Sequence, residues 1–285
     1  MSITPDDIVA HHLNHTGQNV LTIASWVITA VVLGVAIHLT RRAKDPIFVC
    51  VLIASGVAAL AEPLYDVMFS LYFYSGHGMQ KTYTVFDIPQ PVWAYSGYAI
   101  LYGLPAMFIV KEIGEGKMTP ARLWAWAGVE FLESCVFEIA GTSMGTYSYW
   151  GPYEFRIGHY PVVIAVLEAA QVMCFAVACA QLRYRMTAPW QALGTFVIFP
   201  VTMLGANFGA GWTTIVALHA HETTVWWIRA ATVLSILTAA GLVRLVIALI
   251  PRAGSAATAG PVRAAVDEHV VQVVEVPAGV GPVHA

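Results

Sequence analysis

Residues 46–75 read PIFVCVLIASGVAALAEPLYDVMFSLYFYS, and this stretch decides the fold. A helix needs about 20 predominantly apolar residues to cross the roughly 30 Å hydrocarbon core of a bilayer, and the stretch is longer than that. It therefore predicts a membrane-spanning helix that carries the carboxyl groups of Glu62 and Asp66 inside the membrane.

Apolar composition extends over the whole chain. Of its 285 residues, 58% are hydrophobic and 11% are charged, whereas soluble domains carry about 25% charged residues; the mean hydropathy is +0.68. Further stretches long enough to span a membrane lie at residues 20–40, 91–111, 119–143, 160–184, 189–217 and 224–250. We therefore expect an all-α polytopic bundle of about seven transmembrane helices over residues 20–250, with an extracytoplasmic segment 1–19 and a flexible cytoplasmic tail 251–285.

Positive charge is distributed unequally between the predicted loops. One side carries Arg41, Arg42, Lys44, Lys111, Lys117, Arg122, Arg183, Arg185, Arg252 and Arg263, and the other carries only Lys81, Arg156 and Arg229. Because Lys and Arg are retained on the cytoplasmic side, the N-terminus is expected outside a cell membrane and the C-terminus inside. The net charge of −3 provides no basic surface for nucleic acid, so the expected partners are membrane lipids and a lipid-like small molecule.

Ionisable side chains recur inside the predicted spans, although each costs at least about 2.5 kcal/mol in hydrocarbon. Glu62 and Asp66 are four residues apart and share one helix face. Further along, the predicted spans carry Glu130, Glu133, Ser134, Glu138, Glu168, Gln171 and Asn207. Most of these positions fall in the outer half of the membrane, so we expect an acidic chamber there. Some of its carboxyls remain neutral, because like charges this close cannot all ionise in a low dielectric.

Aromatic residues and prolines accompany the embedded carboxyls. The rings that we expect to line the chamber are Tyr65, Trp93, Tyr149, Trp150 and Trp212. Two long outer loops, residues 76–91 and 144–161, are rich in aromatic residues and form either a lid or an aromatic belt at the headgroups. Pro63, Pro105 and Pro200 predict breaks or kinks that open a cavity.

A neutral carboxylic acid among apolar and aromatic walls is suited to protonating an olefin or epoxide and stabilising the carbocation that results. We therefore predict an isoprenoid-modifying enzyme, a membrane-bound terpene cyclase of the isomerase or lyase type. Its proton donor is one of Glu62, Asp66 and Glu168. The supporting positions are Glu130, Glu133, Glu138 and Asn207.

Two other classes of function remain open. Embedded carboxyls also relay protons in proton-coupled transporters, so a small transporter or lipid-handling protein is the main alternative, and a sensor or scaffold is a third. A transporter is expected to have inverted repeats, and the two halves of this chain do not match convincingly.

The sequence lacks the residues that hold several familiar cofactors. The last span, residues 226–250, has no lysine for a retinal Schiff base, and the chain has no Asp-rich run to hold magnesium diphosphate. His38 is the only histidine inside a predicted span, so clustered metal ligands are missing as well. We expect no cofactor and no metal.

Residues 145–151, GTYSYWG, and 158–161, GHYP, resemble the Gly-x-Tyr-x-Tyr loop and following proline of multi-pass carotenoid hydratases and carotenoid-biosynthesis membrane proteins. More broadly, about seven spans with Glu62 in the second span resemble the integral-membrane terpene cyclases of fungal meroterpenoid pathways. That resemblance implies that Glu62 holds the position of an acid that protonates an epoxide or olefin.

The last span departs from the pattern of those cyclases. They place an acid there, and this chain has only Arg229 and Arg244. Either the analogy fails or the second acid has moved to one of the other carboxyls, namely Glu130, Glu133, Glu138 or Glu168.

Overall fold

The computed structural model describes residues 12–251, and in this range the chain is an all-α bundle. Six helical units are long and apolar enough to cross a membrane: His15–Ala43, Ile47–Phe69, Trp93–Gly114, Val162–Arg185, Pro189–His219 and Val225–Ala248. A seventh helix, α7 (Pro120–Ser143), has the same length but carries Arg122 and three glutamates. The prediction of a multi-pass membrane bundle is confirmed. The tail beyond Pro251 lies outside the described residues.

The uninterrupted spans are three helices: α2 (His15–Ala43), α8 (Val162–Arg185) and α10 (Val225–Ala248). The other three are composite. The second contains α3 (Ile47–Ala58), the short helix η1 (Ala59–Ala61) and α4 (Glu62–Phe69). The third contains α5 (Trp93–Tyr98), η2 (Ala99–Gly103) and α6 (Leu104–Gly114), and the fifth contains η3 (Pro189–Gly194) and α9 (Thr195–His219).

Two predicted boundaries were wrong. Residues 15–19 belong to α2, because the Asn14 side chain accepts a 3.1 Å hydrogen bond from the backbone N–H of Gly17 and caps the helix there. The second span ends at Phe69 rather than at residue 75. Ser70 adopts the left-handed conformation (φ 49°), which ends α4 and leads into an extended segment.

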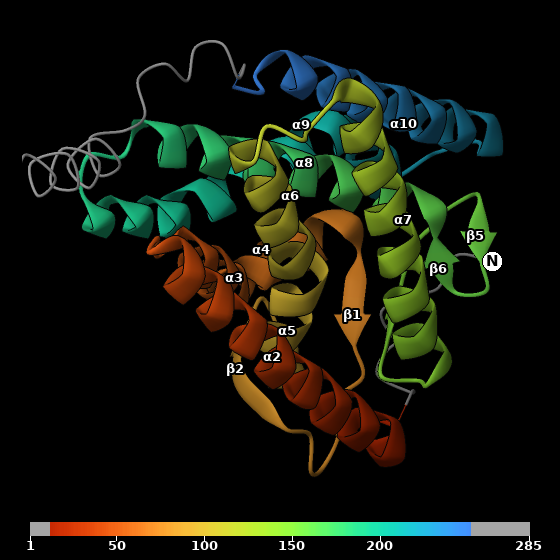
Figure 1. Ribbon diagram of the computed structural model, residues 1–285. Coiled ribbons are helices and arrows are strands. Elements are labelled where there is room, and N and C mark those ends of the chain that lie inside the picture. The colour runs from red at the N-terminus through yellow and green to blue at the C-terminus, as the bar shows by residue number, and fades with distance from the viewer. Residues whose placement is uncertain (1–11, 252–285) are drawn as a thin grey trace, which may run out of the picture.

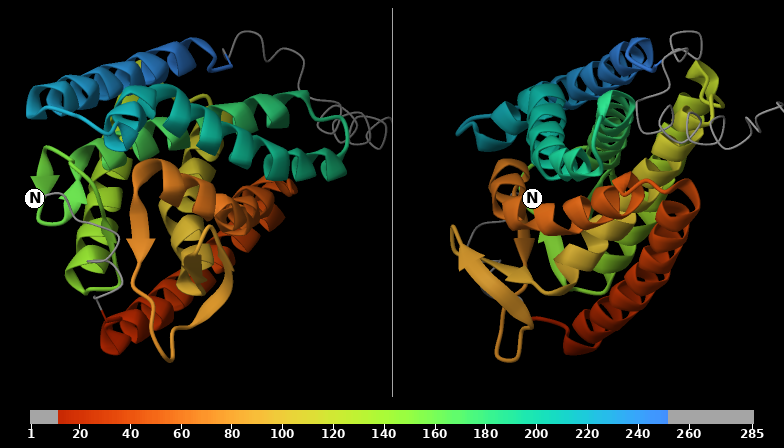
Figure 2. Two further views of the ribbon diagram at one scale, coloured as in Figure 1. Left: turned by 180° about the vertical axis from the view of Figure 1, so that it is seen from behind. Right: turned by 60° about the vertical axis from the view of Figure 1, so that its left-hand side comes forward.

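Helices α8, α9 and α10 pack against one another on one side of the molecule, with α2 at the opposite edge (Figures 1 and 2). The third span and α8 are the central elements, because 83% and 78% of their apolar windows are buried, compared with 22% for α2. The exposed apolar side chains of α2 therefore face lipid. Buried polar side chains gather where α4, α5, η2, α7 and α8 meet.

Two prolines interrupt the helices beside this meeting point. Pro63 lacks a backbone N–H, and the turn before it becomes η1. The Tyr83 hydroxyl lies within hydrogen-bond distance of two carbonyls of this turn, those of Ala59 (3.4 Å) and Leu60 (3.0 Å). Pro105 is the second residue of α6, which follows the π-helix η2, a form found frequently at functional sites. In contrast, α9 continues through Pro200 without a break.

The two long loops contain three antiparallel strand pairs. In the first pair, β1 (Leu71–Phe73) joins β4 (Tyr147–Tyr149), with Leu71 opposite Tyr149 and Phe73 opposite Tyr147. The others are β2 (Lys81–Val85) with β3 (Ile88–Pro91), and β5 (Arg156–Ile157) with β6 (Tyr160–Pro161). The β1–β4 pair therefore connects the end of the second span to the segment that follows α7 (Figure 1).

Candidate functional site

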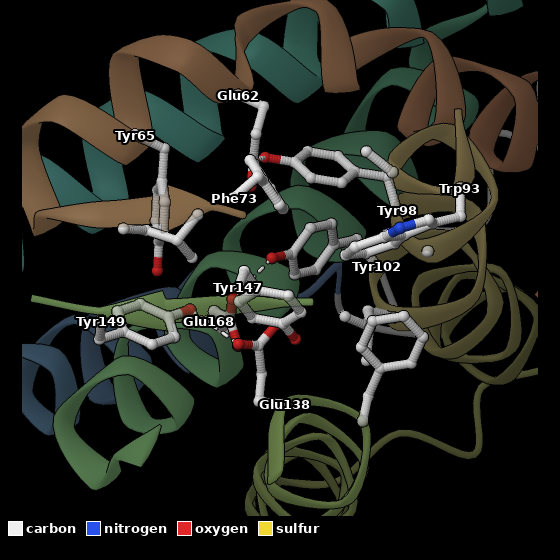
Figure 3. Close-up of a pocket in the computed structure, with 15 residues that line it drawn as sticks. Glu62, Tyr65, Phe73, Trp93, Tyr98, Tyr102, Glu138, Tyr147, Tyr149 and Glu168 are labelled. Atoms are coloured by element: carbon white, nitrogen blue, oxygen red, sulfur yellow. Dashed lines mark hydrogen bonds between the residues drawn. The ribbon is translucent and has the colours of Figure 1, made fainter. Parts of the chain in front are cut away.

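A cavity lies between α4, α5, η2, α7, α8 and the β1–β4 pair (Figure 3). Three carboxyl groups line it, those of Glu62, Glu138 and Glu168. The aromatic rings that line it are Tyr65, Phe73, Trp93, Tyr98, Tyr102, Phe137, Tyr147 and Tyr149. Its volume of about 20 Å³ is enough for about one water molecule. A larger molecule therefore enters only if the lining side chains move.

Glu62 stands at the helix break and bonds to the third span. The Tyr98 hydroxyl donates a hydrogen bond to Glu62 Oε2, and the ring of Tyr98 meets that of Tyr102 edge to face at 4.8 Å. Glu62 is the first residue of α4 after the break and Pro63 the second, so the Glu62 side chain lies in the first turn of that helix. The carboxyl is buried, and Tyr98 is its hydrogen-bonded contact across the cavity.

Glu168 connects three elements. The Tyr102 hydroxyl, from η2, donates a 2.7 Å hydrogen bond to Glu168 Oε1. The Ser134 hydroxyl, from α7, donates a hydrogen bond to Glu168 Oε2 and lies 2.9 Å from the hydroxyl of Tyr160. Both oxygens of this buried carboxyl group therefore accept hydrogen bonds from hydroxyl groups, an arrangement that stabilises a carboxylate.

Glu138 connects α7 to the strand pair. The Tyr149 hydroxyl donates a 2.8 Å hydrogen bond to Glu138 Oε2. Burial is the main cause that raises the pKa of Tyr149 well above its ordinary value, and the nearby Glu138 carboxyl raises it further. The phenol therefore keeps its proton. Tyr149 also packs edge to face on Tyr160 at 5.6 Å. The loop segment that bears Tyr149 thus forms a wall of the cavity, as a lid would.

Tyr65 contributes a hydroxyl that has no hydrogen-bond partner in the described part of the chain. The side chain is buried and points into the cavity toward Tyr149 (Figure 3). Its ring packs on Phe69 at 4.6 Å. Buried polar groups in proteins nearly always have partners, so this hydroxyl is available to a molecule bound in the cavity.

Asp66 is buried but lies outside the cavity lining. Its Oδ2 accepts a 2.7 Å hydrogen bond from Gln90 Nε2, which comes from β3. Asp66 therefore fixes the β2–β3 hairpin against α4, one helical turn from Glu62.

Three of the predicted supporting residues lie farther from the cavity. Glu130 is fully buried on α7, and Glu133 is half-buried on the same helix. Asn207 is buried, but its Nδ2 donates a 2.9 Å hydrogen bond to the Met203 carbonyl of its own helix, so it does not reach the carboxyl groups directly.

Two of the five predicted aromatic positions were wrong. Trp212 is 54% exposed, because it lies on the face of α9 that also exposes Val201 and Val216 to lipid. Trp150 is buried in a separate cluster, where its ring meets that of Tyr74 edge to face at 6.1 Å.

Tyr149 was expected in the cavity, but sequence reasoning missed five of its other rings: Phe73, Tyr98, Tyr102, Phe137 and Tyr147. Tyr98 and Tyr102 are four residues apart in one span, a spacing that places both on one helix face. Tyr147 and Tyr149 alternate in a short segment, which is the strand period. Both signals are present in the sequence, although the pairing of β4 with β1 is not.

The chain matches no known protein family, curated protein or solved structure. Within residues 12–251, no three His, Cys, Asp or Glu side chains are grouped as metal ligands would be. The described cavity lining contains three carboxyls and five tyrosines but no Lys, Arg or His, so it is suited to proton transfer on an apolar molecule.

Proposed function

We propose that this protein is a membrane enzyme that protonates an isoprenoid-type olefin or epoxide and guides the carbocation to a cyclic or hydrated product. One observation carries the proposal: three hydroxyl-bonded carboxyls face a single aromatic cavity whose lining has no basic side chain. Transfer of a proton from a carboxylic acid starts such a reaction. Aromatic faces then stabilise the positive charge.

Glu62 is the proton donor in this proposal. It lies one helical turn from a second carboxyl, Asp66, and two neighbouring carboxyls in a low dielectric do not both ionise. Tyr98 bonds to one of its oxygens. The Glu62 O–H bond breaks, a C–H bond forms at one olefin carbon, and the other carbon becomes the cation.

Glu168 is the proton acceptor, since two hydroxyl groups hydrogen-bond to its oxygens. A second double bond of the substrate attacks the cation to form a ring. Loss of a proton to Glu168 then restores a double bond, and the net reaction is an isomerisation. If water adds to the cation instead, Glu168 takes the proton of the added water and the product is a hydrate. Glu138 and the unpartnered Tyr65 hydroxyl orient the isoprenoid substrate as it bends into the shape that cyclises.

We also propose that substrate enters the cavity from the lipid, between α5 and α7. Phe137 lines the cavity yet is only half-buried, so its ring separates the cavity from the exposed surface of α7. On the opposite side the ring meets Gly97, where a Cβ would lie 3.2 Å from Phe137 Cζ. Rotation of this ring enlarges the closed cavity toward the bilayer of the cell membrane.

The test is turnover by the purified protein in lipid nanodiscs with a panel of linear polyprenols, polyprenyl epoxides and polyenes. Products are identified by mass spectrometry for the wild type, Glu62→Gln and Glu168→Gln, with Glu222→Gln as a control at an exposed carboxyl. We expect an isomer or hydrate from the wild type and the control, and none from the other two variants. If the wild type gives no product from the panel, the proposal is overturned in favour of proton-coupled transport, which a pH-gradient flux assay in liposomes measures.

A further inference from the structure

A second set of buried polar groups lies on α7 and α8, outside the cavity lining and one helical turn from the Ser134–Glu168 hydrogen bond. Glu130 and Gln171 are each 0% exposed. None of the four polar atoms of these two side chains has a hydrogen-bond partner within residues 12–251. Buried amide and carboxyl groups are otherwise paired, so these two side chains can bind a small polar molecule.

The hydrogen bond between Ser134 and Glu168 marks where α7 and α8 touch. Glu130 precedes Ser134 by one helical turn, and Gln171 follows Glu168 by one turn, so each side chain lies on the contact face of its helix. The two helices follow one another in the chain and run in opposite directions. Glu130 and Gln171 therefore lie on the same side of the Ser134–Glu168 contact.

Glu130 and Gln171 lie on the side of the Ser134–Glu168 contact that faces the C-terminal end of α8. Arg183, in the last turn of α8, packs on Gly114 at the end of α6 and bonds to Asp45 at 2.6 Å. The chain passes from Gly114 to the start of α7 at Pro120. Glu133, one turn from Glu130 on α7, is half-buried and lies beside the exposed Leu132. It is therefore a further proton-accepting group one helical turn from Glu130.

We infer that Glu130 and Gln171 hold a water molecule between them and that this site, with Ser134 and Glu133, is the route by which protons leave and reach Glu168. The inference rests on the proposed function, in which Glu168 accepts the proton of the product. The proton on Glu168 passes to the Ser134 oxygen as the Ser134 proton passes to the water. The water in turn gives a proton to Glu130, and only O–H bonds break and form.

The route is testable without a substrate. The full-length protein in nanodiscs is subjected to a rapid acid jump, and time-resolved infrared spectroscopy follows the carboxylate band of Glu168, assigned as the band that is lost in Glu168→Gln. Removal of a positioned proton-transfer group should slow protonation of Glu168 by about 100-fold in Glu130→Gln. The final amplitude should be unchanged, because Glu168 itself is intact.

Two further variants separate the route from a structural role. Gln171→Leu removes the amide that holds the water and should slow protonation as well, whereas Glu130→Asp should restore most of the rate. Wild-type rates in both Glu130→Gln and Gln171→Leu would overturn the inference. A slow response in these variants together with no turnover by the wild type would retain the proton route and reject the proposed reaction, so the two failures are distinguishable.

Discussion

The hydroxyl of Tyr102 donates a 2.7 Å hydrogen bond to Glu168 Oε1 and so joins the π-helical turn of the third span to α8. A π-helix places successive side chains closer to one another around the axis than an α-helix does, at a local cost in helix geometry. Here that turn lies next to Tyr98 and includes Tyr102, whose hydroxyls bond to two different carboxyls.

Replacing Tyr102 by Phe removes this hydrogen bond and keeps the ring. Loss of an interhelical hydrogen bond costs on average about 0.6 kcal/mol in a membrane protein and at most about 1.7 kcal/mol, so the midpoint of thermal unfolding should fall slightly. Turnover should fall too, because the acceptor loses one of the two groups that orient it. Tyr65→Phe is the control, since the Tyr65 hydroxyl has no partner to lose: its unfolding midpoint should stay at the wild-type value.

Glu62→Gln should reduce turnover by about 100-fold or more, because an amide does not donate the proton that general acid catalysis requires. The variant keeps the size of the side chain, and the Tyr98 hydroxyl can still donate to the amide oxygen. Monodisperse elution in detergent and an unchanged circular dichroism spectrum would show that the fold is retained. Full activity in this variant would assign the donor role to another carboxyl.

Gly141 and Gly128 offer a matched pair on α7. A Cβ on Gly141 would overlap the Tyr147 ring and hydroxyl, whereas nothing lies within 4 Å of one on Gly128. Gly141→Ala should therefore displace Tyr147 from the cavity, destabilise the protein by about 1–3 kcal/mol as overpacking does, and lower turnover. Gly128→Ala should be neutral or stabilising by up to about 1 kcal/mol, since Ala favours a helix. Equal unfolding midpoints for the two variants would contradict the placement of Tyr147.

Phe137→Ala should widen the opening between α5 and α7. Because the ring is only half-buried, the loss of stability should stay below the roughly 3–5 kcal/mol of a fully buried Phe. We expect faster turnover of the longest isoprenoids in the panel and little change for the shortest. The ratio of kcat/KM between long and short substrates measures this, and a ratio equal to that of the wild type would place the entrance elsewhere.

The spans could be predicted from sequence because hydrocarbon thickness imposes a length on each apolar stretch, and most predicted ends lie within a few residues of the observed ones. The three carboxyls of the cavity were predicted for a similar reason: a buried charge in lipid must face protein. The orientation of single rings could not be predicted in this way. Trp212 is as apolar on a lipid-facing surface as in a core, so hydropathy does not distinguish the two positions.

Long-range pairing is the other feature that sequence did not provide. Nothing local to residues 71–73 indicates that they pair with residues 147–149, and without that pair Tyr147 and Tyr149 have no defined position. The same limit applies to Glu130 and Gln171, whose shared level follows from the contact between Ser134 and Glu168. A helix pattern gives the face of a residue but not the neighbour that this face meets.

The pairing of Leu71 with Tyr149 also imposes an order on biogenesis. The ribosome synthesises β1 before the third span and α7, so the edge of this strand is at first unpaired. It stays unpaired until α7 has been synthesised and inserted. Only then can β4 reach it. A nascent chain arrested before residue 147 would lack the β1–β4 pair, and the Glu62 carboxyl of α4 would lack the wall that Tyr147 and Tyr149 form beside it.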